Sequence, residues 1–127
     1  MDRLFFVLGS IGALLGVAAG AFGAHAMRAR ITPDMLAVFE TGVRYQLIHS
    51  LALLAVAWAA VRWPARSTTA AGCLFVAGVV LFSGSLYGLA LTGATFLGWI
   101  TPLGGLAFVA GWSCLAWSAW RSSSQPK

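Results

Sequence analysis

The chain alternates between long apolar runs and short polar segments. The first apolar run covers residues 4–24, and further runs cover residues 45–63, 69–92 and 102–120. A helix that crosses the hydrocarbon core of a bilayer needs about 20 apolar residues. Each run meets that length, so the pattern predicts an all-α fold, a four-helix transmembrane bundle.

A polar break at residues 28–32 separates the first run from the second. Thr32, Pro33 and Asp34 then form a helix start, with an N-cap, a proline at the first position and an acid in the first turn. A helix from there to Trp63 is about half as long again as a crossing needs. The excess is amphipathic: Asp34, Ala37, Glu40, Thr41 and Arg44 fall on one side, and Met35, Leu36, Val38, Phe39 and Val43 on the other. We therefore predict a short interfacial amphipathic helix between crossings one and two, a bend at Gly42, and a second crossing that begins near Tyr45.

The remaining connections are short. A basic turn at residues 62–66 precedes the third crossing, which stops at Gly93, and Thr101 with Pro102 repeats the cap-and-proline signature before the fourth. We predict one integral membrane domain over residues 1–121 and a disordered tail over residues 122–127. The glycines of the first crossing fall on one stripe, which predicts a face packed against protein: Gly9, Gly12, Gly16, Gly20 and Gly23.

Composition supports a membrane location, because 60% of the residues are hydrophobic and only 9% are charged. Five basic residues lie on the side of the termini (Arg3, Arg62, Arg66, Arg121 and Lys127), against three on the other (Arg28, Arg30 and Arg44). The positive-inside rule then predicts that both termini are cytoplasmic. The net charge of +5 forms no basic stripe, so no nucleic-acid partner is expected.

Two local features have simple interpretations. The first run could also be a signal peptide cleaved after the Ala24-His25-Ala26 segment, but it is longer than such apolar regions usually are. Cys73 and Cys114 each lie within an apolar run, and we expect both to be small buried hydrophobes with no disulfide or metal role.

The polar residues of the crossings gather in the half that lies away from the termini. The densest stretch is ETGVRYQLIHS, residues 40–50, which directly precedes a continuous apolar run. Polar groups are expensive in lipid and need partners or a task. We predict a water-accessible cavity on the non-cytoplasmic side, a ligand-binding site bordered by Arg44, Tyr45, His49, Tyr87 and Ser83, with Glu40 and His25 at its mouth.

Each of these residues also has a structural interpretation. Glu40 and Arg44 are spaced as an ordinary helix-surface ion pair. His49 could be satisfied by a serine or a backbone carbonyl. Ser83 and Tyr87 lie one turn apart, and their hydroxyls could join helices through hydrogen bonds. The sequence leaves the two interpretations open.

The same segments resemble a family of small bacterial inner-membrane proteins known as domain of unknown function 423. The stretches that carry the resemblance span most of the chain: GAFGAHAM (residues 20–27), RYQLIHSLALL (44–54), LFSGSLYGLALTG (81–93) and ITPLGGLAFVAGW (100–112). The resemblance implies a multi-pass protein of the bacterial inner membrane that retains its first helix. It implies no catalytic residues.

Two functions follow from the sequence. The first is an outward-facing site for a lipid, a quinone or another small amphiphile, because such sites combine an apolar body with a few converging polar groups. The second is a structural or accessory subunit of a larger membrane complex, or a homo-oligomer, that packs through its glycine faces. A transporter should place polar groups through the midplane, where this chain is bare. No nucleophile–base pair, metal spacing or CxxCH haem motif occurs, so we expect no cofactor and lean against an enzyme.

Overall fold

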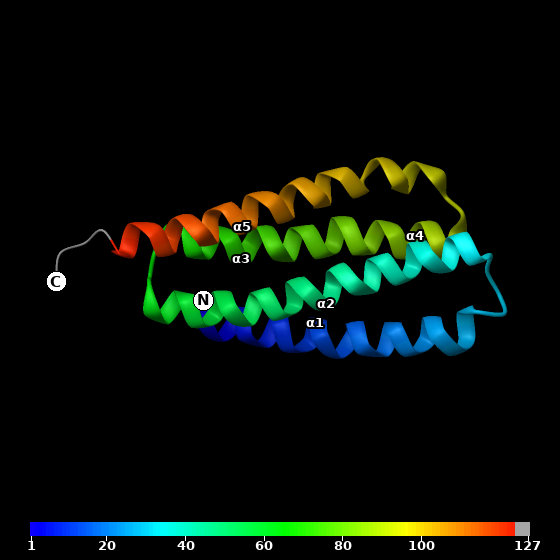
Figure 1. Ribbon diagram of the computed structural model, residues 1–127, viewed down its shortest axis with the longest axis horizontal. Coiled ribbons are helices and arrows are strands. Elements are labelled where there is room, and N and C mark those ends of the chain that lie inside the picture. The colour runs from blue at the N-terminus through cyan, green and yellow to red at the C-terminus, as the bar shows by residue number, and fades with distance from the viewer. Residues whose placement is uncertain (124–127) are drawn as a thin grey trace.

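The structure is a computed structural model, and it describes residues 1–123. It consists of helices joined by short turns (Figure 1). The elements are α1 (Asp2–Phe22), η1 (Gly23–Met27), α2 (Pro33–Arg62), α3 (Arg66–Gly78), η2 (Val79–Ser83), α4 (Gly84–Thr92), η3 (Thr95–Trp99) and α5 (Thr101–Ser123). Within the described part of the chain they form four helical segments long and apolar enough to cross a membrane. This confirms the predicted four-helix transmembrane fold.

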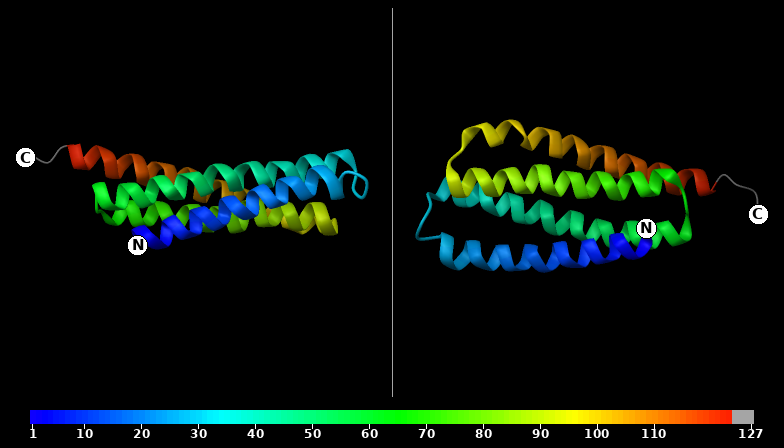
Figure 2. Two further views of the ribbon diagram at one scale, coloured as in Figure 1. Left: turned by 90° about the horizontal axis from the view of Figure 1, so that it is seen from below. Right: turned by 180° about the vertical axis from the view of Figure 1, so that it is seen from behind.

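The helices run alternately up and down, and successive helices lie side by side (Figures 1 and 2). The π-helical turn η2 joins α3 to α4 without a change of direction, so the three elements make one crossing. The N-terminus lies at the same end of the bundle as the α2–α3 turn and the end of α5 (Figure 1). We call this end the terminal end, and the opposite end, with the α1–α2 and α4–α5 connections, the loop end.

Helix α2 differs from the prediction, because it continues from Pro33 to Arg62 without a break at Gly42. Its N-cap is as expected: the Thr32 hydroxyl accepts a hydrogen bond from the Met35 amide. Gly42 is buried, and a side chain there would meet the Tyr87 ring at 2.8 Å. The glycine therefore makes room for a neighbouring helix rather than a bend, and no separate interfacial helix forms.

The glycine stripe of α1 packs against α2, as predicted. A Cβ atom on Gly9 would lie 2.7 Å from the Ser50 carbonyl oxygen, and one on Gly16 would lie 2.7 Å from the Leu47 side chain. The absent side chains let the two helix backbones approach closely. The opposite face of α1 carries large exposed apolar side chains, which suit contact with lipid.

An apolar core fills the terminal half of the bundle. Its fully buried members include Val56 of α2 and Ala71 and Phe75 of α3. Phe5 of α1 reaches the same core and lies against Gly72, where no side chain blocks its ring. Aromatic rings set into glycine positions thus hold three crossings together here.

Two smaller expectations also differ from the structure. Cys73 is exposed rather than buried, and Cys114 is partly exposed. In a chain whose surroundings are lipid, an apolar residue on the outer face of a helix costs nothing, so an apolar run does not imply burial. Helix α5 continues to Ser123, and the rest of the predicted disordered tail, residues 124–127, lies outside the described residues.

Candidate functional site

Gln46 joins three crossings at the middle of the bundle. Its Nε2 atom donates to the Gly12 carbonyl of α1 at 2.9 Å, and its Oε1 accepts from the Tyr87 hydroxyl of α4 at 2.7 Å. The side chain is 7% exposed, so both bonds lie out of contact with lipid. The fixed amide of Gln46 suits this position because it offers a donor and an acceptor at once.

Two serines make further hydrogen bonds between crossings. The Ser83 hydroxyl, fully buried at the end of η2, donates to the Gly42 carbonyl at 2.7 Å. The Ser85 and Thr101 hydroxyls lie 2.7 Å apart and link α4 to the start of α5. Hydroxyls of this kind commonly join membrane helices.

His49 uses both of its ring nitrogens. The Trp112 indole donates to Nε2 at 3.1 Å, so Nε2 must carry a lone pair. The proton of the neutral ring then lies on Nδ1, which donates to the Tyr45 carbonyl at 2.8 Å. The ring also stacks on Phe108, with centroids 3.5 Å apart and planes 10° apart. Protonation of Nε2 would break the bond to Trp112, so this geometry holds the imidazole in the neutral form.

The buried polar atoms are satisfied throughout the part of the chain that the structure describes. Within residues 1–123, no buried side-chain nitrogen or oxygen lacks a hydrogen-bond partner. Paired polar groups of this kind stabilise contacts between membrane helices. Of the predicted site residues, His49, Ser83 and Tyr87 belong to this internal network.

Arg44 and Tyr45 lie at the surface beside that network. Tyr45 is 37% exposed, and its ring lies against Phe82 with centroids 4.4 Å apart. Phe108 lies on a further side of the ring, with centroids 6.0 Å apart. Among the described residues, neither the Tyr45 hydroxyl nor the Arg44 guanidinium has a hydrogen-bond or ion-pair partner. The two side chains are therefore free to meet a ligand.

Glu40 and His25 are also exposed, closer to the loop end. Glu40 lies one turn before Arg44 on α2, yet the two form no ion pair within residues 1–123. His25 lies in η1, on another crossing. The structure thus brings Tyr45 and His49 together, places Ser83 and Tyr87 in the interior, and leaves Glu40 and His25 on the surface.

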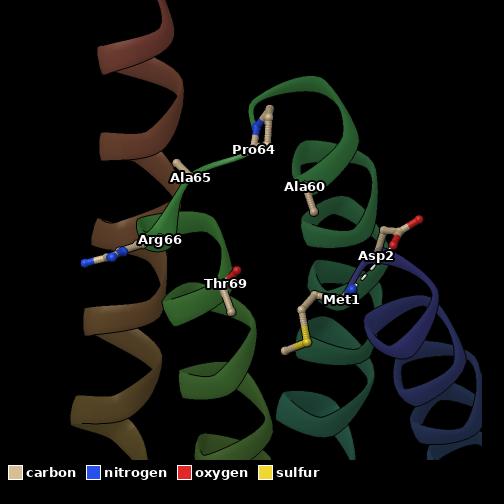
Figure 3. A pocket seen from close by; sticks show the side chains of 7 residues that line it. All are labelled: Met1, Asp2, Ala60, Pro64, Ala65, Arg66 and Thr69. Carbon is tan, nitrogen blue, oxygen red and sulfur yellow. Dashed lines mark hydrogen bonds and ion pairs between the residues drawn. The ribbon is translucent and has the colours of Figure 1, made fainter.

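Two of the hollows in the described structure lie toward the terminal end, and Trp112 borders the second of them. One, of about 410 Å³, lies between the start of α1 and the α2–α3 turn, and Figure 3 shows Met1 and Asp2 facing Ala60 across it. The Met1 amine lies 3.5 Å from the Asp2 carboxylate, and the Arg66 side chain points away from both (Figure 3). The other, of about 300 Å³, is an apolar groove between α2 and α5. No group of three metal-ligating side chains occurs within the described residues.

Sequence reasoning missed two residues of the cluster. Gln46 was expected in the polar half but not as the residue that joins three helices. Trp112 was not expected in the cluster. Both assignments require knowledge of which helix faces which.

Comparison with known proteins places the chain in a family. The family described as "Protein of unknown function (DUF423)" matches residues 19–105. The chain belongs to this family. The UPF0382 membrane protein YwdK of Bacillus subtilis is 50% identical over 111 residues, which cover 87% of this chain and 90% of that protein.

More distant relatives agree. A UPF0382 membrane protein of Haemophilus influenzae is 36% identical over 98% of this chain and 99% of its own length. A UPF0382 membrane protein of Staphylococcus aureus is 42% identical over 89% of this chain and 92% of its own. No solved structure matches. The relatives and the four apolar helices together identify a multi-pass membrane protein of uncharacterised activity, as the resemblance implied.

Proposed function

We propose that this protein holds a small amphiphile, a lipid or a quinone, at the surface of α2 on the side of the membrane away from its termini. Arg44 is the group that binds the polar head, and the exposed Tyr45 ring and hydroxyl bind beside it. The observation that carries the proposal is the contrast in pairing: the buried polar groups have partners, whereas the Arg44 guanidinium has none among the described residues.

The energetics of an arginine in this position support the proposal. Arg44 lies about 16 Å along α2 from its first residue, at roughly 1.5 Å per residue. Arg62 lies about 27 Å farther along the same helix, close to the thickness of a hydrocarbon core, which puts Arg44 at the headgroup level of one leaflet. A guanidinium there is stabilised when it meets a counter-charge. An anionic or carbonyl-bearing headgroup supplies the missing partner. A phosphate or a quinone oxygen can accept hydrogen bonds from the planar guanidinium.

The second function is an accessory subunit with no ligand of its own. The exposure of α1 favours this second function, because only 17% of the residues in the most apolar stretch of that crossing are buried. A partner helix on that face would cover the exposed apolar side chains. The satisfied network would then serve only to keep the subunit rigid.

Chemical identification of what copurifies distinguishes these functions. The protein is purified in a mild detergent as wild type, as Arg44→Gln and as the matched control Arg30→Gln, which removes a charge from the α1–α2 connection. Mass spectrometry then quantifies bound lipids, quinones and proteins in each sample. We expect an amphiphile retained by the wild type and by Arg30→Gln at near-equal occupancy, and depleted by about tenfold in Arg44→Gln.

Equal retention in all three variants would contradict the proposal. A protein partner present at a stoichiometric ratio, with no amphiphile that depends on Arg44, would establish the accessory subunit instead. Tyr45→Phe refines a positive result, because loss of the hydroxyl alone should weaken retention less than loss of the guanidinium does.

A further inference from the structure

The groove between α2 and α5 has the shape and chemistry of a site for a hydrocarbon chain. Its volume is about 300 Å³, and its walls are almost entirely apolar. The lining residues are Ala55, Trp58, Ala59, Trp63, Trp112, Leu115, Ala116 and Ala119. A helix is about 10–12 Å across with its side chains, too thick for a hollow of this size. The groove suits something thinner than a helix.

The tryptophans that border the groove are held by contacts of their own. Trp58 and Trp63 meet edge to face, with ring centroids 5.1 Å apart. Trp112, at the other end, is fixed by its hydrogen bond to His49 and by its ring contact with Phe75 at 4.9 Å. The hollow is therefore formed before anything enters it, which lowers the entropic cost of binding.

Arg62 of α2 is not part of the groove lining, but it lies on the same side of the helix as two lining residues. Ala55, Trp58 and Arg62 follow one another at intervals of three and four residues, so they share one stripe of α2. Arg62 is exposed and has no ion-pair partner among the described residues. It lies about 27 Å from Arg44 along the helix, close to the thickness of a hydrocarbon core. Arg62 thus sits where the headgroups of the second leaflet would be.

The charge of the terminal end agrees with an anionic occupant. Four arginines lie there in the described part of the chain: Arg3, Arg62, Arg66 and Arg121. Asp2 is the acid at this end, and the Met1 amine already lies against it. Anionic headgroups are attracted by about 1 kcal/mol for each basic residue near the surface.

We propose that the groove binds one acyl chain of an anionic phospholipid from the leaflet at the terminal end, with the lipid phosphate on Arg62. This site is distinct from the one at Arg44, lies in the other half of the membrane and does not depend on it. The lipid would fill the space between two helices that contact each other little along this edge, and so join α5 to α2.

Photo-crosslinking tests the site with a defined probe. The full chain, purified and depleted of lipid, is mixed with phosphatidylglycerol that carries a diazirine on one acyl chain, illuminated and mapped by peptide mass spectrometry. We expect adducts on residues 52–63 of α2 and 112–119 of α5. Unlabelled phosphatidylglycerol should compete, and phosphatidylcholine should compete at least about fivefold less well.

Paired variants separate this site from general attraction. Arg62→Gln should lower the crosslinking yield about fivefold, whereas Arg121→Gln, an arginine of the same end that lies over Trp117 at 6.0 Å, should leave it within about twofold. Ala55→Phe should fill the groove and abolish the adducts. Val61→Phe, at an exposed position on another side of α2, should not change them.

Several results would overturn the proposal. One is an equal loss of crosslinking yield in Arg62→Gln and Arg121→Gln, and another is full crosslinking of Ala55→Phe. A third is a wild-type dimer that Ala55→Phe dissociates, because the groove would then be a contact between copies of the chain. Arg44→Gln should leave these adducts intact. If the proposed Arg44 site is wrong, only the copurification result changes. If the proposed groove site is wrong, only the crosslinking result changes.

Discussion

The two halves of the bundle are held together by different means. In the terminal half, the crossings meet through apolar side chains, with Phe5 against Gly72 and Phe75 against Gly111. In the loop half, hydrogen bonds are added to apolar packing. Gln46 bonds to α1 and α4, and Ser83 bonds to α2, beside a buried apolar cluster of Phe39, Val43 and Ala90. Lipid is as apolar as a leucine side chain, so burial alone drives helices together weakly in a membrane. Close packing and hydrogen bonding are the two alternatives. The terminal half relies on close packing, and the loop half combines the two.

The difference separates residues that hold the fold from those that can serve a ligand. In the described part of the chain, each buried side-chain nitrogen and oxygen of the loop half already has a hydrogen-bond partner within the bundle. Arg44 and Tyr45 lie outside the network, with exposed side chains that have no hydrogen-bond or ion-pair partner among the described residues.

The largest effect is expected in the terminal half. Gly72→Leu would place a side chain where the Phe5 ring lies. Phe5 is only 2% exposed, so its ring can shift only by displacing other core side chains. We expect the free energy of unfolding in mixed detergent micelles to fall by about 3 kcal/mol. Gly84→Leu is the matched control, since a Cβ atom there meets nothing within 4 Å. Equal stability of the two variants would mean that glycine packing does not hold this half.

A smaller loss is expected from the centre of the network. Gln46→Leu keeps the side-chain volume but removes both hydrogen bonds and leaves the Tyr87 hydroxyl unpaired. We expect the free energy of unfolding to fall by about 1.5 kcal/mol, near the upper end for hydrogen bonds between membrane helices. In a double-mutant cycle, Tyr87→Phe should cost less in the Gln46→Leu background than in the wild type. Strict additivity would contradict a shared network.

The smallest effect is expected at the bond between Trp112 and His49. Trp112→Phe removes the indole donor and should lower the free energy of unfolding by about 0.6 kcal/mol. Nitrogen NMR of the wild type sharpens the test, because it should show the neutral His49 ring with its proton on Nδ1. In Trp112→Phe the Nε2 resonance should shift while the proton stays on Nδ1. A proton on Nε2 in the wild type would exclude the bond as described.

The sequence predicted the four crossings and the packed face of α1, because run length and glycine spacing are properties of one helix at a time. It also placed Gln46, Ser83 and Tyr87 in the same half of the membrane. It did not predict that α2 continues through Gly42, since the space that this glycine provides is filled by Tyr87 from another crossing. The pairing of Trp112 with His49, 63 residues apart, likewise depends on which helices are neighbours. The ligand site at Arg44 stays a prediction.

Accessibility of single cysteines tests the central claim, that the network is closed and Arg44 and Tyr45 lie outside it. In a chain with Cys73→Ala and Cys114→Ala, Tyr45→Cys and His49→Cys are compared for reaction with a membrane-impermeant maleimide added from the loop end. Tyr45 is 37% exposed and His49 is 3% exposed. We predict labelling at position 45 and protection at position 49 until the protein is denatured. Equal labelling at both positions would show an open, water-filled cavity around His49 and would contradict the closed network.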